Sequence, residues 1–312
     1  MEVISMPMWA WILFYALVIV MLYADLKLFG RKGQHEVSIK EALQMTCVWI
    51  AVSLIFCAGI GHFENGDKAM EFLAGYLIEK SLSMDNLFVF LMLFSFFGVQ
   101  RKYQHEVLFW GIFGALILRS IFIFAGAAMV QRFEWILAIF GVFLIYTGIK
   151  MFGHQEESVD PSKNIFVKLF KKFFPVTDQM HEDKFFIIEN GKRLATPLFI
   201  ALLVIETTDV AFAVDSIPAV FSVSRDPFIV LTSNIFAILG LRALYFALAA
   251  IAQYFQYLKY GLGIILSFVG VKMLLDVFGI CEVPTWMSLL IIFGVLVLSM
   301  AASVILSKAR KQ

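Results

Sequence analysis

Charged side chains are scarce in this chain of 312 residues: only 16% are Asp, Glu, Lys or Arg, and their formal charges nearly cancel to +1. A chain without a marked net charge offers no strong electrostatic attraction to nucleic acid or to an acidic partner. Hydrophobic residues instead make up 61% of the chain, and the mean hydropathy is +0.86. This composition excludes an ordinary soluble domain and indicates a polytopic membrane protein whose surroundings are the lipid bilayer.

Cysteine is scarce as well, with three residues and no CxxC pair. The five histidines fall between apolar segments, so neither a structural zinc site nor a soft-metal site is expected. Cys47 and Cys57 lie in one apolar segment and are interpreted as small buried residues rather than a redox pair. The chain shows no nucleophile–base set, phosphate-binding loop or cofactor motif, which argues against an enzyme and against a permanently bound cofactor.

What the chain does contain is a series of apolar segments long enough to cross a bilayer. Nine are predicted as transmembrane helices: 8–29, 42–60, 75–99, 107–130, 135–152, 196–223, 229–252, 260–278 and 286–306. Alternate loops together with the C-terminal tail hold 17 lysines and arginines, against three in the other loops. Because basic residues favour the cytoplasmic side, we expect the N-terminus outside and the C-terminus in the cytoplasm, with residues 1–312 forming a single membrane domain.

The one long polar segment is the predicted cytoplasmic loop 153–194. Within it, residues 166–174 are either a basic amphipathic helix on the membrane surface or a plain solvated connector, and the loop is also the natural docking site for a protein partner. Asp25, near the cytoplasmic end of the first predicted helix, is interpreted as a solvated acid at the membrane interface.

Five carboxylates fall inside the predicted transmembrane helices, although charge within the hydrocarbon costs about 2.5–3.5 kcal/mol per group. They are Glu79, Asp85, Glu206, Asp209 and Asp215. Acids kept at such a cost usually mark a path for an ion or a proton. The run from Asp209 to Ile217 repeats the pattern of the run from Glu79 to Leu87: an acid, five residues, Asp, then Asn86 or Ser216, then an aliphatic residue.

An internal repeat connects these acids. The pattern of aliphatic residues that ends in Arg119 recurs in the run that ends in Arg242, and Gly148-x-Lys150-Met151 recurs as Gly270-x-Lys272-Met273. The repeats cover residues 71–153 and 195–278 and run in opposite directions through the membrane, so the repeat is inverted. Inverted repeats place the substrate site near the midplane, often on broken helices. Breaks are expected near Asn86, Ser216 and Pro218, since proline removes a backbone hydrogen bond.

We therefore predict an all-α fold of nine transmembrane helices in which Asp85, Asp209 and Asp215 form a central cation site. Glu79 and Glu206 are expected toward the outer and inner mouths, with Asn86 and Ser216 completing the oxygen ligands. Such ligands suit Mg²⁺, Ca²⁺ or Mn²⁺. The alternative is ion pairing, in which Arg119, Arg242 and Lys80 neutralise the acids; the two arginines are either structural counter-ions or gating partners.

Four stretches resemble the TerC family of integral membrane proteins, which is named for tellurium resistance. They are residues 76–89 (YLIEKSLSMDNLFV), 212–219 (FAVDSIPA), 233–242 (SNIFAILGLR) and 258–261 (LKYG). The resemblance extends from Trp9 to about Ser307, and within the family it is to the alkaline-inducible Alx branch of bacterial inner-membrane proteins.

The resemblance implies a lysine-exporter-like fold and export of Mn²⁺ from the cytoplasm as the transported substrate. It implies that Asp85, Glu206, Asp209 and Asp215 are motif acids, with Glu79 as a further one. Two alternatives stay open. The same fold could export another divalent cation such as Ca²⁺, or the protein could be a non-transporting accessory protein for metal loading or for envelope and tellurite stress.

Overall fold

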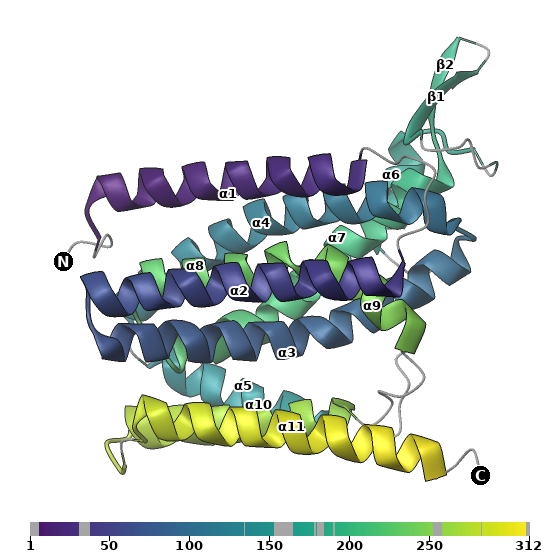
Figure 1. Cartoon of the computed structure of the whole chain (residues 1–312). Coiled ribbons are helices and arrows are strands. Elements are labelled where there is room, and N and C mark those ends of the chain that lie inside the picture. The colour runs from purple at the N-terminus through teal and green to yellow at the C-terminus, as the bar shows by residue number, and fades with distance from the viewer. Residues whose placement is uncertain are drawn as a thin grey trace.

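A computed structural model describes residues 6–30, 38–133, 135–152, 165–177, 179, 184–189, 191–251, 258–281 and 283–309. Eleven helices and one two-stranded hairpin make up these residues (Figure 1). They are α1 (Met8–Gly30), α2 (Ile39–Phe63), α3 (Gly66–Phe96), α4 (Arg101–Arg132), α5 (Ile136–Lys150), α6 (Ile165–Phe173), β1 (Phe186–Glu189), β2 (Lys192–Ala195), α7 (Pro197–Phe221), α8 (Pro227–Leu239), α9 (Leu241–Ile251), α10 (Leu258–Val277) and α11 (Thr285–Ala309).

The helices confirm an all-helical, polytopic membrane architecture. In the described part of the chain, six helices are long and apolar enough to cross a bilayer, namely α1, α2, α4, α7, α10 and α11. The pair α8 and α9, bent by 41°, is a seventh candidate. Helix α3 has 31 residues but carries several charges, and α5 is apolar but has 15 residues. Nine complete crossings therefore stay a prediction, although a helix or the bent pair occupies each predicted range.

Helix ends follow local capping chemistry. Ser38 and Glu41 form a capping box at the start of α2, in which each side chain accepts a hydrogen bond from the other residue's backbone N–H. Asn65 accepts from the N–H of Lys68 and starts α3 nine residues before the predicted span. Asp226 caps α8, whose first residue is Pro227.

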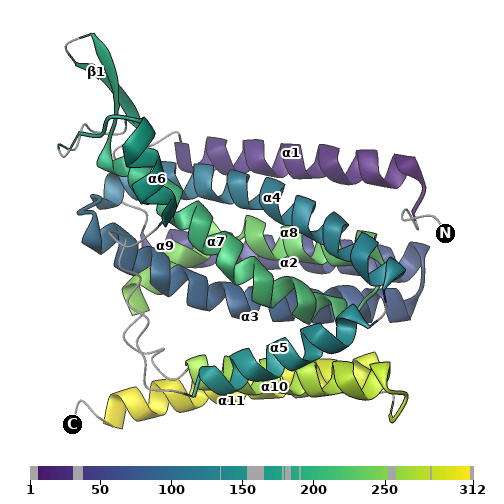
Figure 2. The same ribbon diagram turned by 180° about the vertical axis from the view of Figure 1, so that it is seen from behind.

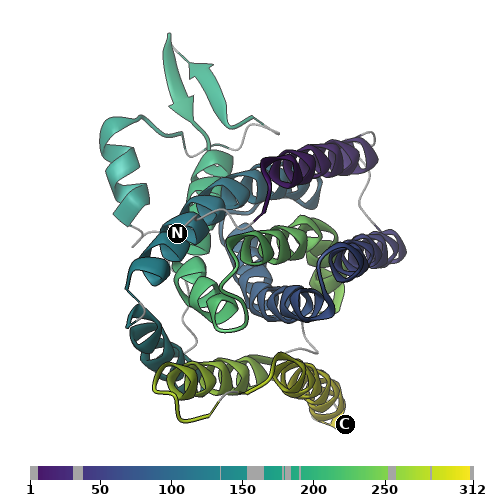
Figure 3. The same ribbon diagram turned by 90° about the vertical axis from the view of Figure 1, so that its left-hand side faces the viewer.

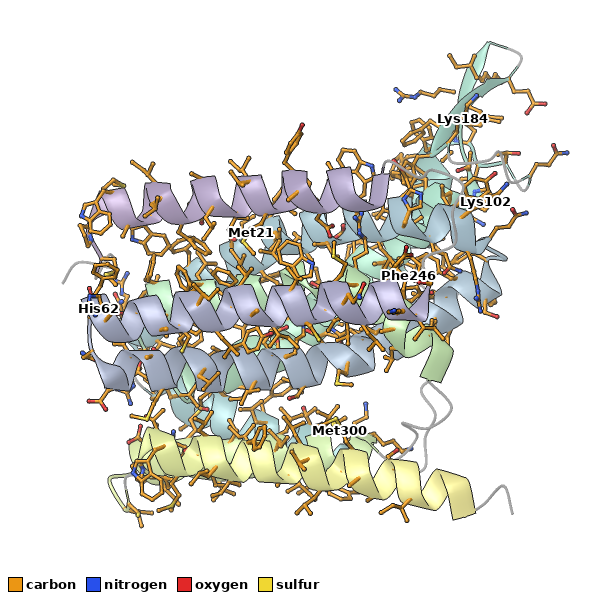
Figure 4. All side chains as sticks on the ribbon, viewed as in Figure 1. Met21, His62, Lys102, Lys184, Phe246 and Met300 are labelled. Atoms are coloured by element: carbon orange, nitrogen blue, oxygen red, sulfur yellow. The ribbon has the colours of Figure 1, made fainter. Side chains whose placement is uncertain are left out.

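The two ends of the chain lie at opposite ends of the bundle (Figure 1), as expected for an odd number of crossings. The hairpin and the C-terminal end share one end of the bundle. Lys102 and Lys184 also lie there, whereas His62 lies at the opposite end (Figure 4). The basic loops thus gather at one end of the bundle; that this end faces the cytoplasm stays a prediction.

Helices α5, α10 and α11 form a layer on the side of the bundle away from α1 (Figures 2 and 3). Within it, α5 and α10 run antiparallel at very short range. A Cβ atom added at Gly270 would lie 2.6 Å from the carbonyl oxygen of Gly141, and one added at Gly148 would lie 2.7 Å from that of Gly263. Close approach through small residues is a common way for helices to pack in lipid, where the hydrophobic effect does not drive association.

Two further helix pairs run parallel. Helix α3 lies beside α8 and runs in the same direction. Near the start of both helices, Glu71 accepts a hydrogen bond from Ser224 (2.6 Å). Further along, the ammonium of Lys80 donates to the carbonyl of Ala237 (3.0 Å). Helix α4 lies beside α7 and also runs in the same direction, because Arg119 binds Asp209 and, further along both helices, Gly126 packs against Phe221. These pairs, α3 with α8 and α4 with α7, surround the centre of the bundle.

The expected breaks near Asn86, Ser216 and Pro218 are wrong, because α3 continues through Asn86 to Phe96 and α7 continues through Ser216 and Pro218 to Phe221. Pro218 lies in the last turn, where little helix follows the hydrogen bond that proline removes. The break lies instead at Gly240, between α8 and α9. Lys80 contributes to the stability of this break, because its ammonium donates to the carbonyl of Ala237, which a continuous helix would pair with the N–H four residues later. Among the described side chains, no salt bridge joins Lys80 to an acid.

Two smaller predictions also need correction. Cys47 is exposed on α2 rather than buried, while Cys57 is partly buried and donates a hydrogen bond to the carbonyl of Ala69 (3.3 Å). The connection between α5 and α7 contains, besides α6, the antiparallel hairpin of β1 and β2, which the all-α prediction missed. Each strand has only four residues, too few for a clear pattern of alternating polarity.

The contact between α5 and α10 leads to a stability prediction. Gly270→Ala should destabilise the protein by about 1–3 kcal/mol, because the new methyl group overlaps the carbonyl oxygen of Gly141. Thermal unfolding of the purified protein in detergent measures the effect. The matched control is Gly294→Ala in α11, where no atom lies within 4 Å of the added Cβ. Equal unfolding midpoints for the two variants would contradict the proposed packing.

Candidate functional site

Arg119 lies at the centre of the bundle and is completely buried, with 0% of its surface exposed. Its guanidinium binds Asp209 of α7 with two hydrogen bonds, from Nε to Oδ2 (3.0 Å) and from Nη2 to Oδ1 (2.8 Å). The remaining terminal nitrogen, Nη1, donates to Oε1 of Glu79 on α3 and to the hydroxyl of Ser216 (3.3 Å). One side chain from α4 thus connects α3 and α7 through charge-assisted hydrogen bonds, which are the strong kind.

Glu79 is held from several sides. The hydroxyl of Ser83 donates to its Oε1 (3.0 Å), and the side-chain amide of Asn234 on α8 donates to its Oε2 (2.7 Å). Glu79, Ser83 and Asn234 are all buried. The central network, defined here as Glu79, Ser83, Arg119, Asp209, Ser216 and Asn234, therefore draws on α3, α4, α7 and α8.

The charges of the central network are unequal. Two carboxylates face one guanidinium, so the group carries a formal excess of one negative charge if both acids are ionised. Buried like charges repel strongly in a medium of low dielectric constant, and here the guanidinium between Glu79 and Asp209 compensates for that repulsion. Within the central network, the acids therefore outnumber the single base.

Glu206 lies beside the central network on the same face of α7 as Asp209, as the spacing of three residues predicts. Its carboxylate occupies the space left by Gly114 of α4, where any Cβ atom would overlap it. Its Oε2 is buried and has no hydrogen-bond partner within the described residues. An oxygen in this state is expensive to bury, and it is available as a ligand or as a proton acceptor.

Asp215 points in another direction, toward α5, where the hydroxyl of Thr147 donates to its Oδ1 (3.4 Å). Asn86 is buried on α3. Asp85 also lies on α3, but its side chain is outside the described residues, so its expected position opposite Asp215 stays a prediction. Among the side chains that the structure describes, no three His, Cys, Asp or Glu residues come together to hold a metal ion.

The structure changes the expected roles of two acids and one arginine. Contrary to expectation, Glu79 shares the central guanidinium with Asp209 instead of lying apart toward the outer mouth. Arg242, the repeat counterpart of Arg119, binds Asp25 of α1 through the side chain (3.0 Å) and through the backbone carbonyl (2.7 Å). Asp25 is therefore not a solvated interfacial acid; only 4% of its surface is exposed.

Residues 64–311 match the family described as Integral membrane protein TerC. The chain belongs to the TerC family. It is 48% identical to an uncharacterized membrane protein, STKORF319, of Myxococcus xanthus, over 96% of this chain and 92% of that protein. It is 46% identical to an Escherichia coli (strain K12) protein provisionally named as the membrane-bound redox modulator Alx, over 96% of this chain and 95% of that protein. No solved structure matches the chain.

A third relative, an uncharacterized membrane protein of Rickettsia bellii, is 40% identical over 95% of this chain and 97% of its own length. None of these three names describes an enzyme. The central network lies wholly inside the part of the chain that matches the TerC family, whereas Asp25 and α1 precede it. The TerC region therefore contains both acids of the network and the arginine that joins them.

Sequence reasoning missed Asn234 and Ser83 as members of the site. Asn234 did carry a signal, since it is an amide in the otherwise apolar run of α8 and lies in a stretch that resembles the TerC family. An amide buried in a membrane helix needs a polar partner. Which acid it binds depends on the packing of α3 against α8, and the order of residues along either helix does not reveal it.

The central network leads to a second stability prediction. Arg119→Gln should destabilise the TerC protein by about 3–5 kcal/mol, because it leaves two buried carboxylates without their counter-ion. Arg225→Gln is the matched control: that arginine forms an exposed pair with Asp276 (3.3 Å), and exposed pairs contribute about 0–1 kcal/mol.

Unfolding midpoints of the purified variants provide the comparison. A triple variant with Arg119→Gln, Glu79→Gln and Asp209→Asn should recover part of the lost stability, since it removes the uncompensated charges. If Arg119→Gln is as mild as Arg225→Gln, the guanidinium does not hold the bundle together.

Proposed function

We propose that this TerC protein is a secondary transporter that exports Mn²⁺ from the cytoplasm through the centre of the bundle. The observation that carries the proposal is the buried group of Glu79, Arg119 and Asp209, in which corresponding acids of the two predicted repeats share one positive charge. Carboxylate, hydroxyl and amide oxygens are the ligands that Mn²⁺, Mg²⁺ and Ca²⁺ prefer.

An inverted repeat explains the arrangement of the helices. In the proposed repeat, α3 corresponds to α7 and α4 corresponds to α8. If the two repeats are exchanged, the parallel pair of α3 and α8 therefore becomes the parallel pair of α7 and α4. It also relates Gly141 to Gly263 and Gly148 to Gly270, so the reciprocal glycine contacts between α5 and α10 are those that a pseudo-two-fold axis would produce. Glu79 and Asp209 are equivalent in the alignment of the two acidic motifs, Glu79 to Leu87 with Asp209 to Ile217. These relations support a substrate site at the repeat interface.

The two parallel pairs are the natural moving units for alternating access. Arg119 and Asp209 both belong to the pair of α4 and α7, and Glu79 and Asn234 both belong to the pair of α3 and α8. The contact between Arg119 and Glu79 therefore joins the two units. A divalent cation that binds the acid oxygens competes with the guanidinium for them, and the release of Arg119 from Glu79 would let the units separate on one side.

The remaining acids complete a path. Glu206 has a buried oxygen that is available beside Asp209, and we assign it to the inner mouth. Asp215, together with Asp85, provides a second position further along. Proton exchange is consistent with this row of carboxylates, because clustered buried acids favour partial protonation. The outward direction and the bacterial inner membrane follow the family resemblance and the excess of basic residues at one end.

There are two alternatives: a transporter for another cation, and a protein that does not transport. Ca²⁺ or another divalent cation would use the same oxygens. A non-transporting accessory role would use the acids only for structure, and the ion pairing of Glu79 and Asp209 with Arg119 favours that role to some extent. A redox role, as in the name of one relative, has less support, because the three cysteines include no CxxC pair and none of them forms a disulfide.

Flux measurement tests the transport proposal. Purified protein in proteoliposomes that contain a Mn²⁺-quenched dye should give saturable Mn²⁺ flux, and Asp215→Asn should reduce it by about tenfold or more because a path carboxylate loses its charge. The matched control is Asp276→Asn, an exposed acid paired with Arg225 at the surface, which should leave the flux unchanged. Competition by Ca²⁺, Mg²⁺ and Zn²⁺ in the same assay identifies the preferred ion.

Normal flux in Asp215→Asn would remove this acid from the path. Absence of flux for every divalent cation and pH gradient, in protein shown to be correctly inserted, would favour the accessory role. In that case deletion within loop 153–194 should abolish function while the carboxylate variants keep it.

A further inference from the structure

Helix α6 presents an apolar stripe that no other described part of the chain covers. Ile165, Leu169 and Phe173 recur every four residues and so share one side of the helix. They are highly exposed, by 76%, 52% and 75% respectively. Their exposure is unusual for side chains outside a transmembrane helix, because bulky apolar groups on a water-facing surface usually mark a binding surface.

The opposite side of α6 is fixed to the protein. Val167 is buried, and the ring of Phe170 packs against Phe199 at a centroid distance of 5.1 Å. Phe186 of the hairpin packs against the same Phe199 (4.5 Å) and against Phe174 (5.8 Å). This aromatic cluster sets the rotation of α6, so the exposure of its apolar stripe follows from the packing.

The position of α6 matches the surface of the bilayer. Phe199 lies in the first turn of α7, a helix long and apolar enough to cross the membrane. Contact with Phe199 therefore places α6 at the level where α7 begins its crossing. In the end view, the transmembrane helices are seen along their axes whereas α6, the teal helix at the left edge, is seen from the side (Figure 3). Its axis thus runs along the membrane surface.

The charge of α6 specifies the lipid. Lys168, Lys171 and Lys172 are exposed, and the helix contains no acidic residue. Lysines beside an apolar stripe can extend toward phosphate groups while their methylene chains stay near the acyl region. Anionic headgroups attract basic residues at the cytoplasmic surface.

We propose that α6 binds anionic phospholipid, with Ile165, Leu169 and Phe173 among the acyl chains and the three lysines at the headgroup phosphates. The interaction is independent of what the bundle transports, since it needs only that α7 spans the membrane. It gives the loop between α5 and α7 a fixed anchor on the bilayer in place of a solvated connection.

The test uses the full chain in vesicles, with an environment-sensitive dye on Leu169→Cys. In all variants the native cysteines are replaced with serine, so that the dye reacts at one position; they are Cys47, Cys57 and Cys281. The serine hydroxyl at position 57 can still donate a hydrogen bond to the carbonyl of Ala69. The matched control carries the dye on Ile188→Cys in β1, an aliphatic residue that is more exposed than Leu169 (79% against 52%). That residue lies on the hairpin, which projects beyond the bundle (Figure 1).

In vesicles that contain about 30% phosphatidylglycerol, spin-labelled lipid should quench the dye at position 169 at least about twofold more than the dye at position 188. Replacement of Lys168, Lys171 and Lys172 with Gln should lower the quenching at 169 to its value in pure phosphatidylcholine. The proposal is overturned if an aqueous quencher reaches both positions equally. It is also overturned if lipid quenching at 169 is independent of phosphatidylglycerol and of the lysines.

Discussion

The bundle depends on one buried guanidinium that is shared between two acids. Arg119 comes from α4, Asp209 from the parallel partner α7, and Glu79 from the neighbouring unit of α3 and α8. In the low dielectric of a membrane protein, two uncompensated carboxylates would repel each other and resist burial. The same group therefore stabilises the bundle and forms its most polar point, which is why structure and proposed transport depend on the same residues.

Many other polar groups of the bundle are satisfied locally, as the bilayer requires, although several buried side-chain atoms, among them the Tyr76 hydroxyl and the indole nitrogens of Trp11 and Trp49, have no hydrogen-bond partner within the described residues. Lys80 donates to the carbonyl that the break at Gly240 would otherwise leave unpaired, and hydroxyl groups such as that of Thr232 donate to the carbonyl four residues earlier in their own helix. Where two helices approach most closely, α5 and α10 use glycine in place of side chains. The oxygen of Glu206 is an exception within the described residues, and exceptions in buried polar networks often mark function.

The two halves of the chain are related but unequal. Arg119 binds both central acids, whereas its counterpart Arg242 binds Asp25 of α1, a helix that precedes the TerC region. Helix α1 thus provides the counter-ion for Arg242, whereas Arg119 pairs with the two acids of the central network.

The sequence alone determined that this is a polytopic helical membrane protein, through its composition, its hydrophobic runs and the count of basic residues in its loops. The matched motifs predicted that the acids lie in equivalent helices of two repeats. These features are local, so they can be read along the chain. Only the tertiary structure decided which partner each charge has: Glu79 joins Asp209, Asp25 binds Arg242, and the helix breaks at Gly240 and not near Pro218. One residue of helix turns a side chain by about 100°, so the packing of neighbouring helices decides which charges meet.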